Sequence, residues 1–213
     1  ANLIYYPTPG PLTLVSEVLE PSTALQVQRG EMGQRAYRTI SFQRDFSKAL
    51  IASIPNNASC LHVHNGSQVE TTLAEDPVLQ SVAAYSHAAR IMTGESSGQV
   101  PEQIFGPEPE HGWCYYYQKA SLARQTGDWQ QIASLASEAA ERELSPGNPV
   151  EWLPFYEAYV NLDQPDARQS MLAAIRSDAL TLKSMCLGLS SSPGAYSSPE
   201  IYQQMVAEIC AQE

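Results

Sequence analysis

The stretch HGWCYYYQKASLARQTGDW, residues 111–129, decides how the rest of the chain is interpreted. Four of the five residues from Trp113 to Tyr117 are aromatic, and Gly127 supplies a helix stop near the end of the stretch. If the stretch is helical, one face carries the residues at offsets of zero, three, four, seven and ten, which are Trp113, Tyr116, Tyr117, Ala120 and Ala123. This spacing predicts that the rings pack between helices, with small alanines allowing a close approach.

A second helix is predicted from Trp129, and the same arrangement returns after the Pro/Gly-rich stop at residues 145–149. The spacing of zero, three, four and seven recurs in Trp152, Phe155, Tyr156 and Tyr159, and a turn follows at Asp163. The two turns, at Gly127 and Asp163, lie 36 residues apart. Self-similarity at this period is typical of stacked helical hairpins.

Residues 111–176 resemble the tetratricopeptide repeat family. Gly127-Asp128-Trp129 matches the family's turn, but Asp163 replaces the turn glycine in the second repeat. The residues that match the two helices of the repeats are Tyr116, Ala120, Ala123, Ala136, Ala139, Trp152, Tyr156 and Tyr159. Two degenerate repeats are fewer than a free-standing array needs, so the resemblance implies that these hairpins lean on other elements.

Before residue 93 the pattern is mixed, with a bias towards strands. Strands are predicted at residues 23–28, 35–42, 49–54 and 60–65, the last two as a hairpin, because β-branched or aromatic residues alternate there between turn signals. A helix is predicted from Pro77 to about Met92, with Asp76 as its N-cap and with Val78, Val82, Tyr85 and Ala89 on one face.

The predicted fold class is therefore α+β, with a strand-rich N-terminal portion followed by a tetratricopeptide-like array of helical hairpins. We place a strand-rich portion with one helix at 1–92, a linker rich in Gly, Pro, Ser and Glu at 93–112, and the helical portion at 113–213.

Composition excludes some partners and leaves the compartment open. A net charge of −11 opposes binding to nucleic acid or to an anionic membrane surface. Neither a phosphate-binding loop nor a dinucleotide fingerprint is present, so no cofactor is expected. The cysteines Cys60, Cys114, Cys186 and Cys210 fit two disulfides, with three possible pairings, or four small core residues.

A second resemblance bears on location. The order of CLHVHN, then WCYYYQKASLARQTGDW, then EWLPFYEAYV is similar to the soluble tail of bacterial multi-span membrane proteins of glycosyltransferase type. The resemblance implies an extracytoplasmic domain tethered to a membrane-spanning region outside this chain, where any catalysis would lie. The alternative location is the cytoplasm.

The leading interpretation is a non-catalytic binding domain whose partner is a protein, a peptide or a glycan. Its possible interaction surface is formed by the aromatic residues Trp113, Tyr115, Tyr117, Trp152 and Tyr156.

The alternative is a metal-dependent hydrolase or another enzyme. His62 and His64 would point the same way from one strand, and His111 could supply a third ligand. The simpler interpretation places Leu61 and Val63 towards the core and leaves both histidines in solvent, so no metal site is predicted.

Overall fold

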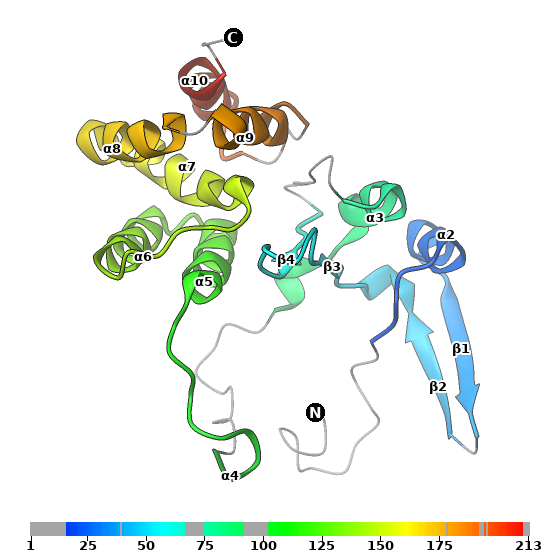
Figure 1. Cartoon of the computed structure of the whole chain (residues 1–213). Helices are drawn as coiled ribbons and strands as arrows, with labels where there is room; N and C mark the ends of the chain where they lie inside the picture. The colour runs from blue at the N-terminus through cyan, green and yellow to red at the C-terminus, as the bar shows by residue number, and fades with distance from the viewer. Residues whose placement is uncertain are drawn as a thin grey trace.

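The computed structural model describes residues 16–38, 40–66, 75–91, 102–177, 179–191, 194 and 196–210. Helices and antiparallel strands are both present, as expected of an α+β chain, but helices dominate. The strands in the described residues form two small two-stranded sheets. Figure 1 shows the helices from α5 onwards as a stack, with the sheets and the helices α2 and α3 together beside it.

The helical part consists of helices that pack on one another in chain order (Figure 1). Their bounds are α5 (Trp113–Thr126), α6 (Trp129–Glu141), α7 (Leu153–Asn161), α8 (Pro165–Arg176), α9 (Ala179–Ser191) and α10 (Pro199–Ile209). Helix α5 begins and ends where the sequence predicts. The predicted cap at Ser198 is also present, because its side chain accepts a hydrogen bond from the backbone of Ile201.

The first hairpin turn and the turn 36 residues later close their helices in the same way. Gly127 and Asp163 both adopt left-handed backbone conformations, with φ of 68° and 49°. The residue after each donates its N–H back across the last turn, Asp128 to Ala123 and Gln164 to Tyr159, both at 3.0 Å. An aspartate tolerates this conformation better than most side chains, which explains how it can stand in for glycine.

The aromatic rings of the helical part form its core, as the spacing predicts. Trp113, Tyr116, Phe155 and Tyr159 are all buried, and Trp152 is partly buried. The ring of Trp113 lies edge-on to that of Trp152, at 4.8 Å between centroids, and 5.2 Å from that of Phe155. Packing of α5 against the start of α7 therefore depends on these rings.

The N-terminal part has a small core of its own, formed between short helices and strands. These are α2 (Pro21–Arg29), β1 (Met32–Tyr37), β2 (Ile40–Asp45), β3 (Ala52–Ser53), β4 (His62–Val63) and α3 (Pro77–Val82). The core residues are Ala24, Val27, Phe46, Ile51, Leu79 and Val82. The predicted hairpin of residues 49–54 and 60–65 is confirmed, with Ala52 opposite Val63 and Ser53 opposite His62.

Two of the strand predictions were wrong. Residues 23–28 lie in α2, which starts at Pro21, buries Ala24 and Val27 at helical spacing, and closes at Gly30 with φ of 60°. Residues 35–42 do not form one strand: residues 35–37 end β1, residues 40–42 begin the antiparallel strand β2, and Arg38 in the turn between them has φ of 55°. That turn carries neither Gly nor Asn, so the usual sequence signal for a hairpin is missing.

The helix predicted to reach Met92 is shorter. The Asp76 cap is confirmed, at 2.7 Å from the backbone nitrogen of Val78, but α3 ends at Val82 and only short 3₁₀ turns follow. Ser86 lies in extended backbone, where its side chain accepts the N–H of Ile51 at 2.9 Å and its carbonyl accepts that of Gly66. These bonds to the hairpin replace the helical ones, and Tyr85 is exposed.

The predicted linker at 93–112 is only partly described. Residues 93–101 lie outside the described residues, and the remainder contains the short helix α4 (Glu102–Phe105). A disulfide between Cys60 and Cys114 joins the segment before β4 to α5, and Cys60 belongs to the same buried cluster as the aromatic rings. A second disulfide joins Cys186 and Cys210, so the interpretation of the cysteines as two bridges is confirmed.

Replacing both Cys186 and Cys210 by serine should lower the free energy of unfolding by about 3 kcal/mol, because the unfolded chain regains the entropy of a closed loop. The chain separation of 24 residues sets this magnitude. Urea unfolding of the variant, with Cys60–Cys114 left oxidised, measures the difference. Full reduction of the unsubstituted chain should cost more, since it opens both loops; an equal loss would contradict the prediction.

Candidate functional site

Glu151 is a buried side chain with several polar partners, in a 3₁₀ turn (Pro149–Trp152) that leads into α7. It is 0% exposed. Its Oε1 accepts the backbone N–H of Cys60 at 2.7 Å and lies 3.1 Å from Nε2 of His62. Its Oε2 accepts the indole N–H of Trp113 at 2.8 Å. One carboxylate therefore joins the segment before β4, β4 itself and α5.

The residues just before Glu151 contact the segment that contains Cys60. Asn148 donates a side-chain hydrogen bond to Ser59 at 3.1 Å. A Cβ at Gly147 would lie 2.4 Å from the carbonyl oxygen of Ala58, so only glycine permits this approach. Residues 58–60 and 147–151 therefore meet as a fitted pair of loops.

A second buried carboxylate, Glu75, lies on the other side of His62. Its Oε1 accepts the hydroxyl of Ser53 at 2.8 Å and lies 3.8 Å from Nδ1 of His62. Nε2 of His64 lies 2.9 Å from Ser53 Oγ and 3.5 Å from the same Glu75 oxygen. We name Ser53, His62, His64, Glu75 and Glu151 the His–Glu cluster.

The two histidines point inwards, which corrects the simpler sequence interpretation. His62 and His64 are 8% and 3% exposed, whereas Leu61 is 41% exposed. Both side chains of the predicted pair do lie on the same side of the strand, but that side is the buried one. The carboxylates of Glu75 and Glu151 supply the partners that make burial of imidazole favourable.

The geometry of Ser53, His64 and Glu75 differs from that of a catalytic triad. In a triad the acid contacts the imidazole nitrogen opposite the one that faces the hydroxyl. Here Glu75 faces the same nitrogen as the hydroxyl does. Since the single proton of Ser53 goes to Glu75, Nε2 of His64 acts as donor and cannot accept that proton. The arrangement therefore lacks the step in which an imidazole takes the proton of the hydroxyl.

His111 does not join the other two histidines. Its Nε2 lies 2.8 Å from Oε1 of Glu108, and its ring stacks on Tyr115 at 3.5 Å between centroids. Within the described ranges, no group of three or more His, Cys, Asp and Glu side chains has a geometry that could hold a metal ion. The proposed three-histidine site is therefore not assembled by these residues.

The predicted aromatic surface is mostly interior, which is a correction. Trp113, Tyr117 and Tyr156 are buried, and the other two members, Tyr115 and Trp152, are partly exposed. The ring of Tyr115 is contacted by His111 and lies 4.5 Å from the ammonium of Lys119. Helical spacing explains this outcome, since Trp113, Tyr117 and Tyr156 belong to the stripes that face neighbouring helices.

Tyr156 gives a test at alkaline pH. Burial, together with the hydroxyl's hydrogen bond to Glu208 and the charge of that carboxylate, raises the pKa of Tyr156 above its usual value of 10.0. The folded state favours the neutral ring, so this stabilisation is complete below pH 10 and is lost as the pH rises further. Tyr156→Phe should therefore show a shallower loss of unfolding free energy above pH 10. Tyr85→Phe, at an exposed ring, is the control and should keep the original slope.

Sequence reasoning missed Ser53 and three buried acids, Glu75, Glu151 and Glu157. A usable signal exists for two of them, because Glu151 and Glu157 interrupt the apolar run NPVEWLPFYEAYV. An acid inside such a run must find a partner when the helix is buried on all sides. Nothing local distinguishes Ser53 or Glu75, whose partners come from other segments.

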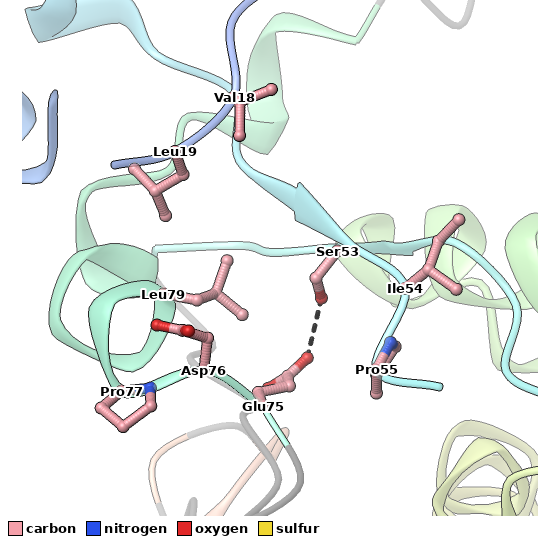
Figure 2. Close-up of a pocket in the computed structure, with 9 residues that line it drawn as sticks. All are labelled: Val18, Leu19, Ser53, Ile54, Pro55, Glu75, Asp76, Pro77 and Leu79. Atoms are coloured by element: carbon pink, nitrogen blue, oxygen red, sulfur yellow. Dashed lines mark hydrogen bonds between the residues drawn. The ribbon is translucent and has the colours of Figure 1, made fainter. Parts of the chain in front are cut away.

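A pocket opens beside the His–Glu cluster (Figure 2), with a volume of about 560 Å³. Ser53 and Glu75 both line it and share the hydrogen bond described above. Its lining residues are Val18, Leu19, Ser53, Ile54, Pro55, Glu75, Asp76, Pro77 and Leu79.

Comparison with known proteins assigns no function to the chain, so a proposal of function has to rest on this geometry. No family model, no curated protein and no solved structure matches the chain. Among the helices of the described residues, none combines the length and the hydrophobicity needed to cross a membrane.

Proposed function

We propose that this chain is a non-catalytic binding domain, built as a tetratricopeptide-like helical array with a smaller partner unit at its N-terminal side. In this proposal it is the extracytoplasmic part of a bacterial membrane protein of glycosyltransferase type, and its partner is a peptide or protein segment. The observation that carries the proposal is the state of the His–Glu cluster: side chains that could do chemistry are buried and engaged with one another.

Two further observations support it. The disulfides Cys60–Cys114 and Cys186–Cys210 favour an oxidising compartment, since such bridges are rare in reducing cytosol. The like-closed turns at Gly127 and Asp163, and the aromatic contacts between α5 and the start of α7, favour a repeated hairpin.

The binding proposal is tested with the labelled chain on arrays of peptides and of glycans. We expect saturable binding to a subset of peptides, with each bound peptide recovered chemically unchanged by mass spectrometry. Cleaved or modified peptides would contradict a non-catalytic role, and binding confined to glycans would contradict the choice of a peptide partner.

The compartment is tested separately, by alkylating native secreted material with and without reductant. We expect no alkylated cysteine without reductant and all four after reduction and unfolding. Four alkylated cysteines in the unreduced sample would contradict the extracytoplasmic location.

A further inference from the structure

The pocket beside the His–Glu cluster combines apolar walls with an acidic end. Leu19, Leu79, Pro55 and Pro77 form walls around the facing pair of Ser53 and Glu75 (Figure 2). Val18 and Ile54 also line it, and they are 82% and 62% exposed, which is unusually open for large aliphatic side chains. The volume of about 560 Å³ falls in the range of sites for small ligands, which is roughly 300–1,000 Å³.

The charges at the pocket have one sign. Glu75 and Asp76 are adjacent, and none of the lining residues is basic. The carboxylate of Glu75 is almost fully buried and already accepts the hydroxyl of Ser53. Asp76 is exposed, and one of its oxygens caps α3 at Val78. A cation entering the pocket would therefore meet the exposed Asp76 carboxylate, close to the Glu75 carboxylate that Ser53, His62 and His64 already contact.

We propose that this pocket binds a lysine side chain that has aliphatic neighbours in a peptide. The aliphatic part of the lysine and its neighbours lie against Leu19, Ile54 and Leu79, and the ammonium group lies at the exposed Asp76 carboxylate. An anionic ligand would be repelled by the carboxylates, and a purely polar ligand would gain nothing from the apolar walls. This inference rests on the proposed function, because it names the chemistry of the peptide partner.

The test uses the full chain, labelled with ¹⁵N, and the acetylated and amidated tripeptide Leu-Lys-Leu as probe. We expect amide signals of residues 53–55 and 76–79 to shift in a saturable way. The same peptide with norleucine in place of lysine should bind about tenfold more weakly, because it keeps the aliphatic contacts and lacks the charge. Equal binding of the two peptides, or shifts confined to other residues, would overturn the inference.

Two variants separate the pocket from the fold. Asp76→Asn removes the charge and keeps a good helix cap, so it should weaken lysine-peptide binding about tenfold with little change in stability. Ile54→Lys places a like charge at the exposed rim and should abolish binding, whereas Leu180→Lys, at an exposed site outside the pocket, should not. Full affinity in Asp76→Asn and Ile54→Lys would overturn the proposed pocket. If peptides from the arrays bind the chain but leave the pocket signals unmoved, the pocket is overturned and the proposed function stands.

Discussion

Replacing Glu151 by alanine will lower the free energy of unfolding by about 4 kcal/mol, as expected when one member of a buried polar cluster is removed. The alanine leaves the N–H of Cys60 and the indole N–H of Trp113 buried without an acceptor. It also leaves His62 without its nearest carboxylate, at 3.1 Å. Urea unfolding with both disulfides oxidised measures the loss.

The matched control is Glu141→Ala, an exposed glutamate near the end of α6, which should change the unfolding free energy by less than about 0.5 kcal/mol. Trp113→Phe removes one of the three donors and keeps most of the ring packing, so it should cost less than Glu151→Ala. In the double variant the two losses should not add, because the indole hydrogen bond is counted in both. A loss at Glu151 no larger than at Glu141 would show that the carboxylate does not hold the two parts together.

Patterns that repeat along a single helix were predictable from the sequence. The stripe from Trp113 to Ala123, the stop at Gly127 and the cap at Ser198 all depend on neighbours within a few residues, and the structure shows each of them. The burial of Phe155 and Tyr159 follows from the same spacing. Local periodicity therefore predicted most of the helical core.

Features set by contacts between distant segments were not predictable. The helix after Asp76 stops early because Ser86 bonds to Ile51, which is 35 residues away in the chain. His62 points inwards because its partner Glu151, 89 residues away in the sequence, is buried in the fold. Alternation in CLHVHN correctly puts both rings on one side of the strand, but it carries no information on which side is buried.

The disulfide pairing shows the same limit. Four cysteines allow three pairings, and their spacing favours none of them. The pairing of Cys60 with Cys114 follows from the meeting of residues 58–60 with 147–151 beside α5, a contact with no local signature. The candidate site therefore depends more on buried and charged partners that are distant in the sequence than on local sequence patterns.

Substituting either partner of the ion pair between Arg124 and Glu157 will destabilise the helical part by about 4 kcal/mol. The guanidinium Nε lies 2.5 Å from Oε2 of Glu157, and the two residues are 6% and 0% exposed. Arg124→Met leaves Glu157 buried without its guanidinium partner, and Glu157→Leu removes the carboxylate partner of Arg124. Because solvent does not reach the pair, the loss should persist in 0.5 M salt, unlike that of a surface ion pair.

The double variant Arg124→Met/Glu157→Leu separates the cost of an unpaired charge from the value of the pair. It should recover more than half of either single loss, since apolar side chains of similar size often replace a buried pair without net cost. Recovery stays incomplete because Glu157 also accepts the backbone N–H of Ser197 at 2.7 Å, and the double variant loses that hydrogen bond. Guanidinium chloride would screen charges, so urea is the denaturant of choice. Fully additive losses in the double variant would mean that the two side chains stabilise the fold independently, through packing and not through their mutual charge.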